Sequence, residues 1–133
     1  MYYGAVETLE RIIVATIEEL MLANLLEVFN ERDPQARQSA IARTYVPGVR
    51  FFDPDDVVEG HEALDAKAGS ILDGAPGFVF SPSGPIRTNH DLGYLEWSFG
   101  PTGQPPVVKG LDIALVADGK ITTVYTLLLT EPS

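Results

Sequence analysis

The order of helical and strand patterns along the 133-residue chain predicts an α+β fold. Apolar residues recur at helical spacing in the first half, whereas the second half alternates apolar and polar residues in runs typical of antiparallel strands. A strongly curved antiparallel sheet wrapped around the N-terminal helices would bury one face of every element. We find no linker or repeat, so we expect a single domain over residues 1–133.

Three helices are predicted. The first covers residues 5–30, where apolar side chains return every three or four positions. The second begins at Pro34, behind the N-cap residue Asp33, and ends at the Pro-Gly pair 47–48. The third covers about residues 61–72, before a segment rich in glycine and proline.

The remaining elements are predicted to be strands. One runs through "VRFFD", and the short runs "VVEG" and "FVFSP" form two more. The alternation in "LGYLEWSFG" places Leu95, Trp97 and Phe99 on one face. The dipeptide Asp118-Gly119 predicts a tight hairpin between the last two strands.

The charge balance narrows the classes of partner. With 19 acidic and 9 basic residues, the formal net charge is −10, which disfavours nucleic acids and anionic membranes as partners. The chain has no cysteine, so disulfides and thiolate chemistry are excluded. Glutamates interrupt the longest apolar run and the N-terminus lacks a secretion signal, so we expect a cytoplasmic protein.

Two aspartates lie within apolar strand patterns and are the candidate catalytic residues. Asp53 ends a buried strand and precedes a proline, so it is either a turn residue or a carboxylate aimed into a cavity. Asp112 lies in "LDIALV", whose other residues are apolar; it either serves chemistry or bonds a backbone amide or His90.

The segments "FFDPDDVVEGHEAL" and "KGLDIALVADGKI" carry a resemblance to a known family. Together with the order of elements from about residue 20 to residue 129, they look like the nuclear-transport-factor-2-like (SnoaL-like, cystatin-like) fold. That superfamily forms a cone with a deep pocket. It includes ketosteroid isomerases, polyketide cyclases, scytalone dehydratases, limonene epoxide hydrolases and non-catalytic proteins, so the fold alone does not define the function.

The resemblance implies roles for both aspartates. Asp53 matches the general base of ketosteroid isomerases, and Asp112 matches the aspartate that they keep protonated as an oxyanion donor. Leu25 stands where those isomerases have a tyrosine donor. Polyketide cyclases of this fold rely on one strand aspartate as acid and base, which Asp112 could match. The Arg-x-Asp pair of the epoxide hydrolases does not occur in this sequence, and His90 could imitate the dehydratase histidine.

We therefore expect a hydrophobic pocket for a carbonyl-bearing apolar small molecule, and a cofactor-independent isomerase or cyclase that uses aspartate acid–base chemistry. The alternative is a non-catalytic binding module of the same fold. The acidic run at residues 53–59 lacks the pattern of a calcium loop, so we interpret it as a solvated turn and expect neither metal nor cofactor. The expected substrate-binding residues are Phe52, His90, Trp97, Phe99, Ala114 and Tyr125.

The last two strands also predict an assembly. Their second face carries Leu111, Ile113, Leu127 and Leu129, which a monomer would expose to water. We therefore expect a homodimer that forms through the sheet.

Overall fold

The computed structural model describes residues 14–130 and contains a seven-stranded sheet in the order β2-β1-β7-β6-β5-β3, with β4 paired to β5. The helical segments are α2 (Ile17–Leu22), η1 (Ala23–Val28), α3 (Pro34–Thr44) and α4 (His61–Asp73). The strands are β1 (Tyr45–Phe52), β2 (Val57–Glu59), β3 (Phe78–Pro82), β4 (Arg87–Asn89), β5 (Leu92–Pro101), β6 (Val108–Ala117) and β7 (Lys120–Leu128).

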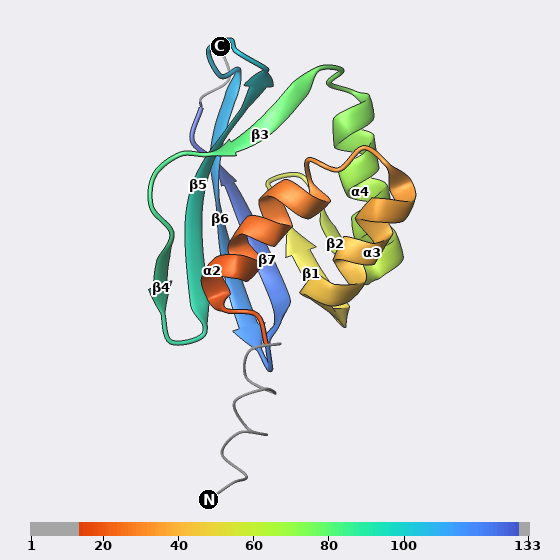
Figure 1. Ribbon diagram of the computed structural model, residues 1–133, viewed down its shortest axis with the longest axis vertical. Helices are drawn as coiled ribbons and strands as arrows, with labels where there is room; N and C mark the ends of the chain where they lie inside the picture. The colour runs from red at the N-terminus through yellow and green to blue at the C-terminus, as the bar shows by residue number, and fades with distance from the viewer. Residues whose placement is uncertain (1–13, 131–133) are drawn as a thin grey trace, which may run out of the picture.

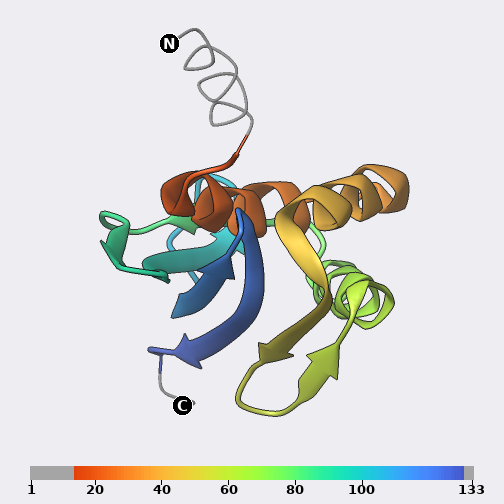
Figure 2. The ribbon, with the colours of Figure 1, turned by 90° about the horizontal axis from the view of Figure 1, so that it is seen from below.

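The helices cover one face of the bent sheet (Figures 1 and 2). Helix α2 packs against β5, whereas α3 and α4 lie at the β1–β2 end. The α+β class and the curved sheet around the helices are confirmed. The predicted antiparallel pairing is found for the other strand pairs, but β1 pairs with β7 in parallel, so the sheet is mixed. These two strands are distant in sequence, and a sequence pattern carries no signal for their relative direction.

Part of the predicted first helix, residues 14–16, is not helical in the structure. Residues 5–13 lie outside the described part of the chain, and from residue 14 onward the helix begins at Ile17. Thr16 caps it: its hydroxyl accepts the amide N–H of Glu19 at 3.1 Å, and the Glu19 carboxylate accepts the amide N–H of Thr16 at 2.8 Å. This capping box requires an extended backbone at Thr16, so the helix that follows starts at Ile17 although the apolar periodicity of the sequence extends further back.

The second helix begins as predicted and ends earlier. Asp33 accepts the amide N–H of Ala36 at 2.8 Å, as an N-cap residue does, with Pro34 at the first helical position. The helix ends at Thr44, because Tyr45 is already extended and fully buried as the first residue of β1. Pro47 lies in β1 where the register with β7 shifts, a site where a missing amide N–H is tolerated.

The hairpin prediction is confirmed. Strands β6 and β7 pair through Ala117 and Lys120, and the turn residues Asp118 and Gly119 have φ values of 52° and 76°. Both values are in the left-handed region that a two-residue turn of this kind requires.

Two glycines allow close packing beside the candidate site. A Cβ on Gly93 would lie 2.7 Å from Met21 Sδ, so only glycine lets α2 approach β5 this closely. A Cβ on Gly110 would lie 2.6 Å from Trp97 Cη2, and Trp97 is its cross-strand neighbour. The indole ring of Trp97 can therefore lie flat across β6.

Between residues 14 and 130, the structure has no helix of the length and apolar character needed to cross a membrane.

Candidate functional site

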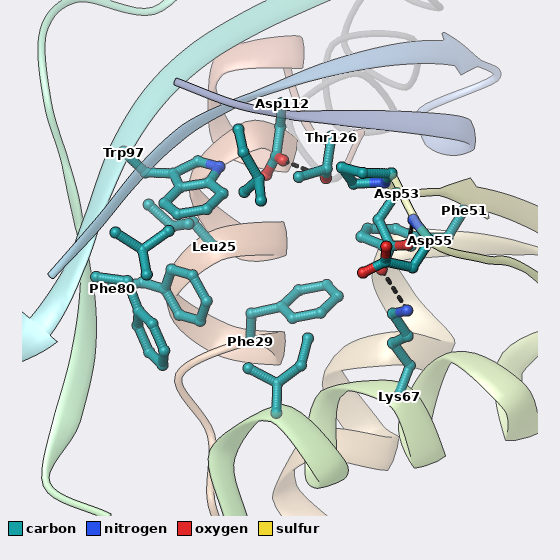
Figure 3. A pocket seen from close by; sticks show the side chains of 15 residues that line it. Leu25, Phe29, Phe51, Asp53, Asp55, Lys67, Phe80, Trp97, Asp112 and Thr126 are labelled. Carbon is teal, nitrogen blue, oxygen red and sulfur yellow. Dashed lines mark hydrogen bonds and ion pairs between the residues drawn. The ribbon is translucent and has the colours of Figure 1, made fainter. Parts of the chain in front are cut away.

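A cavity of about 340 Å³ lies between the sheet and the helices, and both candidate aspartates line it (Figure 3). Most of its wall is apolar, and among the residues that the structure describes its charged side chains are those of Asp53, Asp55, Lys67 and Asp112. The remaining lining residues are Leu25, Phe29, Phe51, Pro54, Ile71, Phe80, Trp97, Phe99, Val108, Thr126 and Leu128.

Interlocked aromatic rings form one wall. Phe80 stacks on Phe99 with ring centroids 4.0 Å apart and meets the Trp97 ring edge-on at 5.1 Å. Phe29 stacks on Phe51 at 5.2 Å and links η1 to β1. Because each ring packs against another, the contacts between the rings stabilise this wall.

Asp112 is 5% exposed, and each of its carboxyl oxygens accepts a hydrogen bond. The Thr126 hydroxyl donates to Oδ1 at 2.6 Å, and the Asn24 amide donates through Nδ2 to Oδ2 at 2.9 Å. Thr126 is the cross-strand partner of Asp112, so the register of β6 and β7 creates the first contact. The second contact comes from η1, whose wider turn joins the amide N–H of Phe29 to the carbonyl of Asn24 at 3.2 Å.

A buried tyrosine fixes the orientation of Asn24. The Tyr45 hydroxyl donates to Asn24 Oδ1, which leaves Asn24 Nδ2 to face Asp112. Tyr45 is fully buried, and its burial, reinforced by the nearby charge of Asp112, raises its pKa well above the ordinary value. Tyr45 therefore stays a neutral donor. It does not line the cavity, so it does not replace the tyrosine donor that Leu25 lacks.

These contacts determine which form of Asp112 is favoured. Burial raises its pKa to about 6, against the opposing effects of donors from Thr126, Trp97 and Asn24. A carboxyl that accepts a hydrogen bond at each oxygen suits the ionised form. The geometry thus favours a carboxylate that accepts protons near neutral pH, rather than the permanently protonated donor that the resemblance implied for this residue.

Asp53 is held in a turn at the mouth of the cavity. Its Oδ1 accepts the amide N–H groups of Asp55 and Asp56 at 2.9 and 2.8 Å. Its Oδ2 forms an ion pair with Lys67 of α4 (Figure 3). The Lys67 Nζ also lies 3.9 Å from Asp56 Oδ2. Both interpretations of Asp53 therefore hold in part: it stabilises a turn, and it also lines the cavity.

The structure brings only some of the expected substrate-binding residues together. Trp97 and Phe99 line the cavity, as their position on the inner face of β5 predicts. Ala114 is on the inner face of β6 but is buried in the core, beside Gly93 where α2 covers the sheet. It does not line the cavity.

The other three expected residues point elsewhere. Phe52 and Tyr125 stack on each other with centroids 4.5 Å apart, on the face opposite to Phe51 and Thr126. Successive side chains of a strand alternate between faces, so a one-residue difference decides which face is reached. His90 is exposed at the tip of the β4–β5 turn, with φ of 53°, and contacts neither aspartate.

Sequence reasoning missed Asn24, Thr126 and Lys67. Asn24 is a polar residue on the apolar face of its helix, four positions after Leu20 and four before Val28. A polar residue at such a position needs a buried hydrogen-bond partner, so the sequence pattern could have identified it. Lys67 likewise lies between Leu64 and Ile71 on the inner side of α4. No comparable signal identifies Thr126, because only the strand register places it beside Asp112.

Comparison with known proteins adds a family match and several structural matches. Residues 22–124 match the family described as the SnoaL-like domain. No curated protein matches the sequence. A proposed isomerase of the SnoaL-like family from Agrobacterium tumefaciens str. C58 is similar with a TM-score of 0.78 and 20% identity, over 84% of this chain and 95% of that one.

Two further structures share the fold. A proposed SnoaL-like polyketide cyclase from Jannaschia sp. CCS1 has a TM-score of 0.63 and 19% identity, over 78% of this chain and 81% of that one. A proposed ketosteroid isomerase from Kribbella flavida DSM 17836 has a TM-score of 0.62 and 13% identity, over 87% and 82%. At these identities the likeness establishes the fold and not the reaction.

Proposed function

The chain belongs to the SnoaL-like domain family, and from this premise we propose that it is a cofactor-independent isomerase or cyclase acting on an apolar, carbonyl-bearing small molecule. One observation carries the proposal. Asp112 has a pKa raised to about 6, and it lines an otherwise mostly apolar cavity. A general base or acid works best when its pKa is close to the operating pH.

The proposed reaction needs one carboxylate. Asp112 removes a proton from the carbon beside the ligand's carbonyl group, and the electrons of that C–H bond form an enolate. Returning the proton to another carbon completes an isomerisation. Alternatively, attack of the enolate carbon on a second carbonyl group of the same molecule closes a ring, and the proton on Asp112 passes to the new alkoxide.

Asp53 has a supporting role in this proposal. Two backbone amides and the Lys67 ammonium already occupy three of its about four lone-pair sites, so Asp53 has fewer free lone pairs for taking a proton than Asp112 has. The ion pair instead forms a polar rim at the cavity mouth. The roles differ from those that the ketosteroid isomerase resemblance implies, where Asp53 is the base.

Hydrogen–deuterium exchange of an enolisable ketone tests the proposal. With 2-tetralone in D₂O, followed by proton NMR, the parent should accelerate exchange above the buffer rate. Asp112→Asn should lower the acceleration by about two to four orders of magnitude. Asp53→Asn should retain most of it, as should Asp73→Asn, an exposed control on α4.

Two other outcomes of this exchange experiment would contradict the proposal. Full activity in Asp112→Asn with loss in Asp53→Asn would restore the isomerase-like assignment of roles. Binding of 2-tetralone without any acceleration by the parent would favour the alternative, a binding module whose cavity holds an apolar ligand.

We also propose that the protein is a homodimer formed through the outer face of the sheet. Tyr125, Leu127 and Leu129 on or just beyond β7 are 44%, 47% and 47% exposed. Leu111, the cross-strand neighbour of Leu127, is only 9% exposed, so the expectation that a monomer would expose it is wrong and the exposed apolar surface is that of β7. A second copy would remove this surface from water.

A further inference from the structure

Trp97 has a buried hydrogen-bond donor without an acceptor. It is the only tryptophan of the sequence, is 5% exposed and lines the cavity. Its Nε1 has no hydrogen-bond partner among the described residues. A buried N–H without an acceptor destabilises a protein by about 1–3 kcal/mol, so such groups are rare unless a ligand or water serves them.

The surrounding residues fix the direction of this donor. Gly110 leaves room for the indole ring over β6, and Phe80 packs edge-on against it. Figure 3 shows the indole nitrogen on the edge of the ring that faces Asp112. The N–H lies near enough to affect the Asp112 carboxyl, but it does not reach the distance and angle of a hydrogen bond with it. The donor and the carboxylate are therefore neighbours at one end of the cavity.

We propose that the Trp97 Nε1–H group binds the carbonyl oxygen of the ligand and thereby selects oxygen-bearing ligands over hydrocarbons of the same shape. The inference rests on the proposed function for the class of ligand. In the ketosteroid isomerases a tyrosine at the position of Leu25 donates to the substrate oxygen. Here the donor would come from Trp97 on β5 instead. Trp97 would thus be a residue that both positions the ligand and determines specificity.

The chemistry of enolisation fits this arrangement. The proton that Asp112 removes and the carbonyl oxygen are carried by adjacent carbons, so the base and the donor for that oxygen should be neighbours. As the C–H bond breaks, its electrons form a C=C bond and the carbonyl π electrons move to oxygen. A hydrogen bond from a neutral N–H is stronger to the resulting enolate than to the ketone, so it lowers the barrier as well as orienting the ligand.

Nitrogen-15 labelled protein gives a direct test, because one tryptophan yields one indole N–H signal. The probes are 2-tetralone and tetralin, which share a ring system and differ in the carbonyl group. Saturation with 2-tetralone should move the indole proton signal downfield, as a new hydrogen bond does. Tetralin exerts a similar ring-current effect and should leave the signal near its position or move it upfield.

A second measurement uses Trp97→Phe, which keeps an aromatic ring and removes the donor. The parent should bind 2-tetralone about fivefold more tightly than tetralin, and Trp97→Phe should bind the two equally. Phe29→Leu is the control: it should weaken both ligands and preserve the ratio, since Phe29 offers only apolar contact.

The outcomes separate this inference from the proposed function. Equal indole shifts from both ligands, or an unchanged preference in Trp97→Phe, would overturn the role of Trp97 even if the parent still catalyses exchange. A downfield shift with 2-tetralone but no exchange would support the donor and contradict the enzyme. If neither ligand binds the parent, both proposals fail. The NMR arm uses the parent protein, so it does not depend on the folding of a variant.

Discussion

Asn24 and Asp112 are 88 residues apart in the sequence, yet the Asn24 amide donates a hydrogen bond of 2.9 Å to the Asp112 carboxyl. The Tyr45 hydroxyl holds the amide in this orientation from behind. Within residues 14–130, Asp112 is thus a carboxyl embedded in neutral donors, with no hydrogen-bonded cation to offset its charge. Its protonation should therefore respond to each of these donors and should in turn influence stability.

The pH dependence of stability should reveal the raised pKa of Asp112. Its pKa changes from an ordinary 3.8 to about 6 on folding, so between these values the folded protein binds more protons than the unfolded chain. Stability from this group is complete below about pH 4 and is lost as the pH rises through about 6. The loss amounts to about 3 kcal/mol.

Comparison with Asp112→Asn isolates this effect from other titrating groups. The free energy of unfolding of the parent minus that of the variant should fall by about 3 kcal/mol between pH 3 and pH 7. Urea unfolding at several pH values measures it. A difference that is flat with pH would mean that Asp112 titrates alike in both states.

Tyr45→Phe should destabilise the protein by about 1–3 kcal/mol, because it leaves the buried Asn24 Oδ1 without a donor. It should also raise the pKa of Asp112, since the freed Asn24 amide can turn away from the carboxylate. Tyr94→Phe is the matched control. The Tyr94 hydroxyl donates to the Glu96 carboxylate at 2.9 Å in a partly exposed position, where water can replace it, so its loss should cost much less than the loss of the Tyr45 hydroxyl. Equal losses in the two variants would contradict the buried network.

Thr126→Val should raise the pKa of Asp112 further above 6. Valine has nearly the same shape as threonine, so the change removes the 2.6 Å donor to Asp112 Oδ1 with little repacking. Loss of a donor to the charged form disfavours ionisation. Carbon-13 NMR of the Asp112 carboxyl, and the midpoint of the exchange rate against pH, should move upward together. Thr123→Val, on the same strand without contact to Asp112, should leave both unchanged.

The sequence predicted the elements well where local chemistry decides them. Asp33 as a cap and Asp118-Gly119 as a turn act through their own neighbours, and the structure contains both. Thr16 shows the limit, because its capping box interrupts an apolar periodicity that continues on both sides. Periodicity reports which face is buried, not whether the backbone is continuous.

The site was predictable only in part for a related reason. Asp112 stood out as a carboxylate in an apolar strand, but its donors come from η1 and β7. Thr126 reaches it through strand register, and a shift of one residue would have presented Tyr125 instead. The same alternation explains why Phe51 lines the cavity while Phe52 stacks on the outer face.

The Lys67–Asp53 ion pair should contribute more to stability than an exposed pair. The side chains of Lys67 and Asp53 are 16% and 15% exposed, whereas those of the Arg43–Glu27 pair, 2.8 Å apart, are 60% and 51% exposed. A double-mutant cycle with Lys67→Met and Asp53→Asn should give a coupling energy of about 1–3 kcal/mol. The cycle with Arg43→Gln and Glu27→Gln should give a coupling energy of about 0–1 kcal/mol. A larger coupling energy for this exposed pair than for Lys67–Asp53 would contradict the prediction.

A charge on the outer face of the sheet should abolish the proposed homodimer without disturbing the cavity. Leu127 is 47% exposed, and Tyr125 beside it on the same face is 44% exposed, so a lysine at position 127 can reach water in the monomer. In a dimer formed through this face the same ammonium would be buried without a partner, which is strongly unfavourable. Light scattering at micromolar concentration should therefore find a dimer for the parent and a monomer for Leu127→Lys.

The control is Val79→Lys, on β3 at the other end of the sheet. It replaces an apolar residue that is 37% exposed and should leave the dimer intact. The monomeric variant should still bind 2-tetralone, because Leu127 does not line the cavity. A parent that is already monomeric would remove the dimer proposal, and a Leu127→Lys dimer would assign the interface to another surface.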